Sequence, residues 1–385
     1  MKRVTRWTCL GAFLFLTFQG VSAVRPSEIG KMIREISEEN VETILKKLAS
    51  FETRHVYSSD REGFGIKAAA TWIHEKFSSL SPRLEVSFDT YDLPAQRGRL
   101  NREVTIHNVV AVLPGKQTGD KERIFLVNAH YDSYARPPDS GYPKDSFDNP
   151  APGVNDDASG VAALLEMARV FSRHEFDASV YFVAFAGEEV GLVGSTLMAA
   201  RLNGEGKRID GVITLDMIGN IEGGNGLIDN RRMRVFSDGP EDSPSRQLAR
   251  YAKKVGESHL PSAEIDCIFR ADRFGRGGDH TPFVLEGWPG IRMMEANENY
   301  SRQHTADDTL ENMSVDYCTR NIRIVASILA SLAAAPPAPG INDERGRLLL
   351  RRGPGGYDAQ LGWNPVPCDN LAGYKVYWRK TIAPF

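Results

Sequence analysis

Short apolar segments of strand-like character alternate along this chain with longer segments of helical periodicity. The clearest of them is Ser179–Ala186, which reads SVYFVAFA and is apolar at nearly every position. A strand without a polar face is expected where helices cover both faces of its sheet. Similar strands, rich in β-branched residues, are expected at 124–129, 211–215 and 290–295. The alternation predicts one α/β domain with a mixed, mostly parallel central sheet flanked by helices.

The remaining elements follow from periodicity and from proline content. Apolar residues recur at helical spacing in the segments 24–50, 65–77, 158–171, 194–202, 243–255, 281–285 and 315–332. Two further strands are predicted at 84–93 and 107–113. Residues 133–153 carry five prolines and are predicted to form a long loop. Loops of this length in a compact domain are usually either functional or disordered.

The N-terminus has the features of a secretory signal peptide over residues 1–23. Basic residues precede an apolar stretch from Cys9 to Phe18, and Val21-Ser22-Ala23 fits a small-residue cleavage site. The apolar stretch is shorter than the ~20 residues that a membrane span needs, which makes an uncleaved anchor the weaker alternative. We therefore expect a secreted or periplasmic protein with no stable membrane insertion after cleavage.

The charge balance argues against nucleic acid as a partner. The chain has 385 residues, with 47 Lys or Arg, 50 Asp or Glu and a formal net charge of −3, and no segment forms a basic footprint. Cysteine is sparse: Cys9 belongs to the signal, and Cys267, Cys318 and Cys368 remain. Three cysteines permit at most one internal disulfide. Nothing in the sequence predicts an oligomeric state.

The composition changes after the last predicted helix. The segment 335–342 begins APPAPG and is predicted to be a Pro-rich linker. It separates a main domain, 24–334, from an all-β tail, 343–385. Short strands are expected in the tail at 348–350, 359–363 and 374–378. A segment of about 45 residues is close to the size below which a domain seldom folds alone.

Polar residues with metal-binding chemistry follow three of the predicted strands. They are His130 and Asp132, the pair Glu188-Glu189, and Asp216. In an open α/β sheet the functional site lies at the carboxyl ends of the strands. Histidine and carboxylate oxygen are the ligands of a zinc ion that stays reactive. The pattern, together with Asp156-Asp157 and His304, predicts metal-assisted hydrolysis.

Pairs of acidic residues suggest a division of roles within this set. Asp132 lies two residues after His130, where a carboxylate would orient the imidazole and raise its basicity. One member of Asp156-Asp157 is expected to bridge two metal ions, with a strained or cis peptide bond between the two residues. One member of Glu188-Glu189 is expected to bind metal, while its neighbour takes a proton from the attacking water and passes it to the leaving amine.

Five ordered motifs carry a family resemblance. They are AHYDS from Ala129, GVNDDASG from Gly153, GEEVG from Gly187, LDMIG from Leu215 and GDHTPF from Gly278. These motifs resemble the double-zinc aminopeptidases of bacterial leucyl-aminopeptidase type, zinc-dependent exopeptidases similar to peptidase family M28, over about residues 50–330.

The resemblance implies two zinc ions per chain. One ion would be bound by His130 and Asp216 and the other by Glu189 and His304, with Asp156 bridging them. The resemblance also implies a cis peptide bond after Asp156. Finally, it implies that Glu188 is the general base and that Asp132 contacts His130 without binding a metal ion itself.

One position departs from the family pattern. Several relatives place a tyrosine shortly before the Asp279-His280 pair, and its phenol stabilises the tetrahedral oxyanion; the corresponding residue here is Phe274. Loss of one oxyanion donor typically costs ~10²–10³ in rate. Tyr300 is a candidate to supply the missing phenol. Arg273 and Arg276 are candidate contacts for a substrate carboxylate, with a solvated basic loop as the equal alternative. Asp279-His280 is expected to line the site without binding metal.

The tail carries a second resemblance. Leu361-Gly362-Trp363 and GYKVYW at 373–378 resemble the opening strands of a fibronectin type III domain. For the whole chain we expect a secreted zinc aminopeptidase that acts on peptide or protein substrates by a two-zinc mechanism with a bridging hydroxide. A carboxypeptidase or a glutaminyl cyclase on the same fold is the alternative. A non-catalytic binding protein is disfavoured because every expected ligand is present.

Overall fold

The computed structural model describes residues 26–98, 100–119, 122–136, 147–272, 277–353, 355–356, 359–366 and 373–378. The chain forms two compact units, of which the larger spans Ser27–Ala333 and the smaller contains the described residues from Ala334 onward. The predicted signal peptide lies outside the described residues, as do Arg273, Phe274 and Arg276. Of the helices within those ranges, none is long and apolar enough to cross a bilayer.

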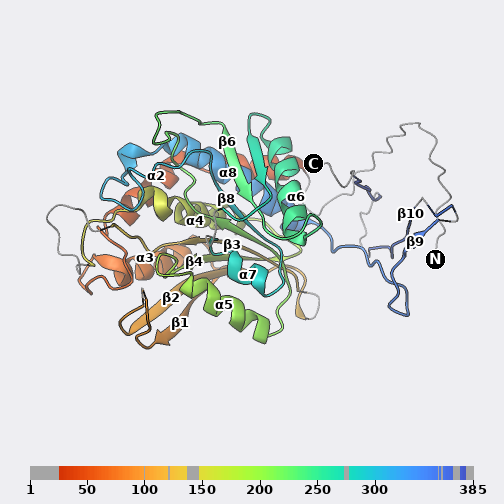
Figure 1. The fold of residues 1–385 in the computed structure, drawn as a ribbon, viewed down its shortest axis with the longest axis horizontal. Coiled ribbons are helices and arrows are strands. Elements are labelled where there is room, and N and C mark those ends of the chain that lie inside the picture. The colour runs from red at the N-terminus through yellow and green to blue at the C-terminus, as the bar shows by residue number, and fades with distance from the viewer. Residues whose placement is uncertain are drawn as a thin grey trace. The chain divides into compact units, whose positions relative to one another are not determined.

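A mixed eight-stranded sheet forms the centre of the larger unit, in the spatial order β1-β2-β4-β3-β5-β8-β6-β7 (Figure 1). The strands are β1 Glu85–Leu93, β2 Val104–Leu113, β3 Ile124–His130, β4 Ser179–Phe185, β5 Ile209–Leu215, β6 Arg232–Phe236, β7 Glu264–Ile268 and β8 Gly290–Glu295. The four central strands β4, β3, β5 and β8 are parallel to one another. Antiparallel pairs join β1 to β2, β2 to β4 and β6 to β8. The predicted fold class is confirmed.

Helices pack on both faces of this sheet. They are α1 Pro26–Glu35, α2 Glu38–Ala49, α3 Gly65–Leu80, α4 Ser159–Phe171, α5 Val193–Gly204, α6 Pro244–His259, α7 Thr281–Leu285 and α8 Val315–Ala334. Helices α4, α6 and α8 lie on one side of the sheet, and α5 and α7 lie on the other (Figure 1). Every residue of β3 and β4 is therefore buried, which explains why these strands are apolar without alternation.

Side chains of the central strands alternate between the two helical layers. Leu126 on β3 and Phe185 on β4 belong to a buried cluster with Met198 and Leu202 of α5 and Phe283 of α7. Neighbouring strand residues point to the opposite face. The sheet is thus held between two apolar layers, and the expected metal ligands lie at the ends of strands or in the loops beyond them.

Two parts of the predicted secondary structure were wrong in the larger unit. The helix predicted over 24–50 is divided into α1 and α2, because the Ser37 side chain accepts a hydrogen bond from the Asn40 N–H and begins a new helix there. Strands β6 and β7 were missed, since their sequences RMRVF and EIDCI include charged residues and are partly exposed. Both strands lie at one edge of the sheet.

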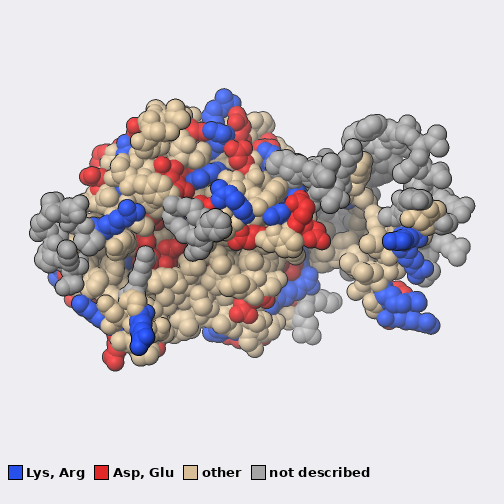
Figure 2. Space-filling model, viewed as in Figure 1, with Lys and Arg blue, Asp and Glu red and all other residues tan. Residues whose placement is uncertain are grey.

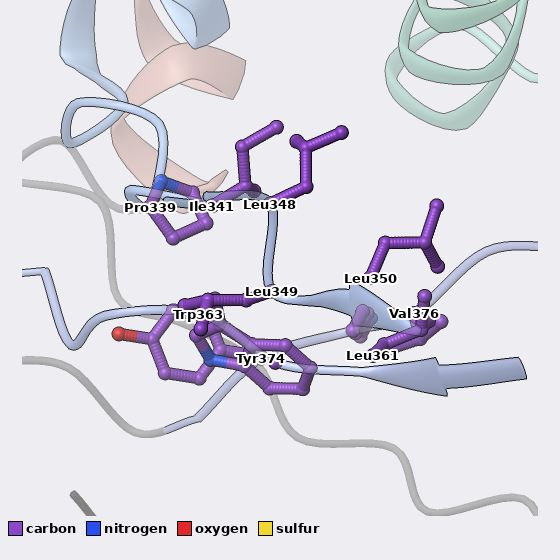
Figure 3. Close-up of a pocket in the computed structure, with 11 residues that line it drawn as sticks. Pro339, Ile341, Leu348, Leu349, Leu350, Leu361, Trp363, Tyr374 and Val376 are labelled. Carbon is purple, nitrogen blue, oxygen red and sulfur yellow. The ribbon is translucent and has the colours of Figure 1, made fainter. Parts of the chain in front are cut away.

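The smaller unit contains a two-stranded antiparallel sheet of β9, Leu350–Arg352, and β10, Ala359–Leu361. The strand predicted at 374–378 is not formed, and the one predicted at 348–350 is displaced toward the C-terminus. A cavity of about 360 Å³, which we call the apolar hollow, is lined mainly by Pro339, Ile341, Leu348, Leu349, Leu350, Leu361, Trp363, Tyr374 and Val376 (Figure 3). The resemblance to a fibronectin type III domain stays a prediction.

Candidate metal centre

The predicted site residues meet at the carboxyl ends of the central strands. His130 is the last residue of β3, the pair Glu188-Glu189 follows β4, and Asp216 follows β5 directly. Parallel neighbours end at the same edge of a sheet, so these side chains share one location. Asp156 comes from a π-turn at Val154–Ala158, just before α4. His304 comes from the loop after β8 and has a left-handed backbone with φ 58°.

Asp156 lies between the two histidines. Its Oδ1 is 3.2 Å from Nε2 of His130, and its Oδ2 is 3.1 Å from Nε2 of His304. Each histidine also faces a carboxylate of its own: His304 lies 3.0 Å from Oε1 of Glu189, and His130 lies 3.8 Å from Oδ1 of Asp216. The geometry therefore brings all five predicted ligands together as two histidine–carboxylate pairs that share Asp156.

Asp157 is close to this cluster but has other partners. Its Oδ1 accepts hydrogen bonds from the backbone N–H groups of Gly160 and Met217, and its Oδ2 accepts one from the N–H of His130. Possible ligand atoms of His130, Asp157 and Asp216 do lie within 4.8 Å of one another. The three N–H groups nevertheless make Asp157 an anchor for the surrounding loops. The Asp156–Asp157 peptide bond is cis, as predicted.

Asp132 supports the site from behind, and it does so in two ways. Nδ1 of His130 lies 3.5 Å from Oδ1 of Asp132 and 3.1 Å from its carbonyl oxygen. The Asp132 carboxylate also accepts hydrogen bonds from the backbone N–H groups of Glu188 and Glu189, at 3.2 and 3.1 Å. Asp132 therefore lies within contact distance of the imidazole and also binds the turn that carries both glutamates.

The electrostatics of the cluster favour a positive charge at its centre. Burial, together with nearby Asp156, raises the pKa of Glu189 to about 7. Burial and the neighbouring carboxylates also raise the pKa of Glu188 well above its ordinary value. Burial opposes protonation of His304, but hydrogen bonds to Asp156 and Glu189 outweigh it and raise its pKa to about 10. Carboxylates so close together repel one another unless a cation lies between them.

The donor set fits zinc in both chemistry and spacing. Donor atoms at about 2.0–2.1 Å from a tetrahedral zinc ion lie roughly 3.3 Å from one another. The histidine–carboxylate distances of the two pairs and of shared Asp156 range from 3.0 to 3.8 Å. Four of the five residues are almost fully buried, and the His304 side chain is 18% exposed. Substrate would therefore reach the centre from the side of His304.

Among the described residues that contact the ligands, Arg292 and Gln303 were not predicted. Arg292 on β8 is 1% exposed, and its Nη2 lies 2.9 Å from Oδ2 of Asp216. Gln303 donates from Nε2 to Oδ2 of Asp156 at 2.9 Å. The signal for Arg292 was an arginine within the mainly apolar sequence of its strand, GIRMME. No sequence signal distinguished Gln303 from a surface residue.

Of the predicted substrate contacts, Tyr300 lies within the described residues, and Arg273 and Arg276 do not. Tyr300 is 44% exposed, and its hydroxyl donates to Glu298, which also pairs with Arg234 at 2.8 Å. Asp279-His280 is buried beside the site and outside the five-residue cluster. An aromatic neighbour that was not predicted is Tyr134, whose ring lies edge-on to His304 with the ring centroids 5.5 Å apart.

The fold and the paired histidine–carboxylate centre are those of a metal-dependent hydrolase, and comparisons with known proteins agree. The sequence profile of peptidase family M28 matches residues 108–329. A probable zinc metalloprotease of Leptosphaeria maculans is 34% identical, over 94% of this chain and 89% of the relative. The chain belongs to peptidase family M28.

Solved structures share the fold at lower identity. An aminopeptidase from Legionella pneumophila, LapA, has a TM-score of 0.62 and 22% identity, over 83% of this chain and 78% of that chain. A glutaminyl cyclase from Porphyromonas gingivalis has a TM-score of 0.59 and 16% identity, over 77% of this chain and 98% of that chain. One fold thus supports both reactions, so the activity has to be argued from the residues of the site.

Proposed function

We propose that this protein is a secreted zinc aminopeptidase, similar to the bacterial leucyl-aminopeptidases, which removes N-terminal residues from peptides or proteins. The observation that carries the proposal is the position of Asp156, with one carboxylate oxygen toward His130 and the other toward His304. A shared carboxylate between two histidine–carboxylate pairs is the arrangement that a two-metal hydrolase needs. The relatives described as probable zinc metalloproteases support zinc as the metal.

The ligand assignment gives two zinc ions per chain. His130 and Asp216 would hold one, Glu189 and His304 would hold the other, and Asp156 would be shared. Zinc bound in this way supplies Lewis acidity toward the scissile carbonyl and lowers the pKa of a bound water. We assign the catalytic domain to residues 24–334, the linker to 335–342 and the fibronectin-like segment to 343–385.

Glu188 is the proposed general base. It is half-buried beside the ligands, and its backbone N–H donates a hydrogen bond to the Asp132 carboxylate. Its raised pKa, which burial among carboxylates causes, brings it toward the range in which a carboxylate exchanges protons effectively near neutral pH. Glu188 would accept the proton of the attacking water and transfer it to the leaving amine.

The charge of the site supports amino- over carboxypeptidase activity. A carboxypeptidase needs a cation for the C-terminal carboxylate. The two buried arginines nearby are engaged elsewhere: Arg292 pairs with Asp216 and Asp272, and Arg54 binds backbone carbonyls.

Peptides are favoured over nucleic acid as partners. Figure 2 shows basic and acidic side chains interspersed over the visible face of the larger unit, without a continuous basic patch. A nucleic-acid interface would require such a patch. The net charge of −3 agrees with this view.

The proposal is tested by metal content and substrate range together. Elemental analysis of zinc-replete protein should find two zinc ions per chain. Aminoacyl amides with a free N-terminus should be hydrolysed, N-acetylated ones should not, and amidation of a peptide's C-terminus should have no effect. A requirement for a free C-terminal carboxylate would indicate a carboxypeptidase, and ring closure of N-terminal glutamine with ammonia release would indicate a cyclase. An N-terminus at Val24 in the exported protein would support signal cleavage.

A further inference from the structure

Arg54 is a fully buried arginine that lies behind the candidate metal centre. Its exposed fraction is 0%. In the described part of the chain its guanidinium forms no ion pair, and it donates instead to four backbone carbonyls. These belong to Tyr131 at 2.6 Å, Leu48 at 3.2 Å, Pro152 at 2.5 Å and Gly153 at 2.9 Å. A charged group is thus used entirely to bind main chain.

Three of these carbonyls belong to the segments that carry metal ligands. Tyr131 lies directly after His130, and Pro152 and Gly153 directly precede the π-turn that contains Asp156. The guanidinium therefore joins the end of β3 to the start of the π-turn. Its planar fork of donors can bind several carbonyls at once, which the single ammonium group of a lysine cannot reproduce.

The Arg54 backbone makes the same connection. Its N–H donates to Oγ of Ser133 at 2.9 Å, and that hydroxyl donates onward to the carbonyl of Ala151 at 2.7 Å. Ser133 follows β3, and Ala151 precedes the π-turn. Side chain and main chain of one residue therefore link the same two segments twice.

Gly153 provides independent evidence for the closeness of this fit. Its backbone is left-handed, with φ 52°. A Cβ at this position would lie 2.9 Å from Nη2 of Arg54 and 2.7 Å from the Cβ of Ser133. Both distances are too short for real side chains, so the main chain can approach the guanidinium this closely only as glycine.

The charge of Arg54 is placed among the acidic residues of the site. Burial lowers its pKa to about 10, and the nearby carboxylates of Asp308, Asp132, Asp157 and Asp156 oppose that shift. Arg54 therefore stays positive at neutral pH. Burying an arginine without an ion pair is costly. The hydrogen bonds to the ligand-bearing loops explain why a charge is placed here.

We propose that Arg54 is a positioning residue for the metal centre, which holds His130 and Asp156 at the separation that two metal ions require. The inference rests on the proposed function, because it concerns metal binding at that site. Loss of Arg54 frees the two segments from each other, so that ligands must be reordered each time metal binds. Replacing groups that orient metal ligands typically lowers metal affinity ~10–100-fold.

The test compares zinc affinity in Arg54→Ala, Arg54→Lys and a control, Arg123→Ala. Arg123 is also a buried arginine, with 3% of its side chain exposed, and it donates to Gln117 at 2.9 Å. It directly precedes β3, at the strand end remote from His130. Affinity is measured by competition with a chromophoric chelator, and the folded fraction by circular dichroism. We expect a ~10–100-fold loss in both Arg54 variants and a change of less than about twofold in the control.

Chemical rescue separates positioning from general stability. Millimolar methylguanidinium should restore zinc affinity in Arg54→Ala, whereas methylammonium should not, because only the former has the planar set of donors. Folded Arg54 variants with wild-type zinc affinity would overturn the inference and leave the proposed function intact. Failure of both variants to fold even with methylguanidinium, while Arg123→Ala folds, would also overturn it. Wild-type protein that binds no zinc would refute the proposed function itself.

Discussion

Arg292 and Asp216 form a buried ion pair beside the candidate metal centre, with Nη2 of the arginine 2.9 Å from Oδ2 of the aspartate. The other carboxylate oxygen of Asp216 faces Nε2 of His130 at 3.8 Å. One oxygen is thus neutralised within the protein, and the other is directed toward the site. Arg292 therefore limits how much negative charge Asp216 offers to a metal ion, and it holds that carboxylate in one orientation.

Replacing Arg292 should make folding depend more strongly on zinc. In Arg292→Met the Asp216 carboxylate stays buried without its partner, and breaking such a pair typically costs roughly 3–5 kcal/mol. Bound zinc would supply the missing positive charge. Urea unfolding with EDTA and with excess zinc should show a larger zinc-dependent gain in the variant than in the wild type. Equal losses under both conditions would mean that Arg292 acts on packing alone.

Glu188→Gln should keep both zinc ions and lose turnover. Glutamine has nearly the same shape but cannot accept a proton, and general-base catalysis typically contributes ~10²–10⁴-fold. Steady-state kinetics and elemental analysis of the same preparation give both quantities. Glu189→Gln is the matched control, because it alters the neighbouring ligand and should lower zinc content. Activity of Glu188→Gln within a few-fold of wild type would show that another group is the base.

Asp156→Ala should remove both zinc ions together, because the carboxylate lies between both histidines. Loss of a ligand to one ion alone would leave the other in place. Zinc content per chain after dialysis is the measurement, with Asp266→Ala as the control, since Asp266 is exposed on β7. One full equivalent of zinc in Asp156→Ala would contradict a shared carboxylate.

His55 should make the protein less stable in acid. Burial lowers its pKa to about 4, although Asp132 opposes the shift. Its Nδ1 accepts a hydrogen bond from the N–H of Tyr57, and its ring stacks on Phe147. Between pH ~6.5 and ~4 the unfolded chain binds a proton that the folded chain excludes. The free energy of unfolding therefore falls as the pH falls through this window, by roughly 3 kcal/mol in total.

The contribution of His55 is isolated by comparison with His55→Gln, which cannot titrate. Urea unfolding at pH 7 and pH 4.5, with EDTA in all samples to remove metal effects, should show a smaller loss in the variant. The same loss in both proteins would assign the acid sensitivity to other groups.

Removing residues 336–385 should leave zinc content and turnover unchanged. All five proposed ligands lie in Ser27–Ala333. The smaller unit also exposes large apolar side chains, among them Leu350, Tyr377 and Trp378, and Leu350 lines the apolar hollow of Figure 3. Exposed strand edges and apolar surface promote association. Light scattering during heating should therefore show less aggregation after truncation, and a loss of zinc would show that the tail supports the catalytic unit.

The sequence predicted the centre of the fold better than its edges. Strands β3 and β4 were recognisable because burial on both faces makes them apolar throughout. Edge strands β6 and β7 were missed because charged residues interrupt that pattern. The proposed ligands could be selected from the sequence because histidine and carboxylate side chains follow predicted strands, and the structure brings them together. Arg54 was not, because its partners are backbone carbonyls, which carry no sequence signature.

The order of the strands has a consequence for how the protein matures. His130 is synthesised as the last residue of β3. His304 is synthesised only after β8, which joins the sheet beside β5. Until then a folding intermediate would hold a group of buried carboxylates, Glu189 among them, without His304. Because metal binding draws its free energy from the assembled site, zinc supply during folding should determine how much of the newly made chain escapes aggregation and proteolysis.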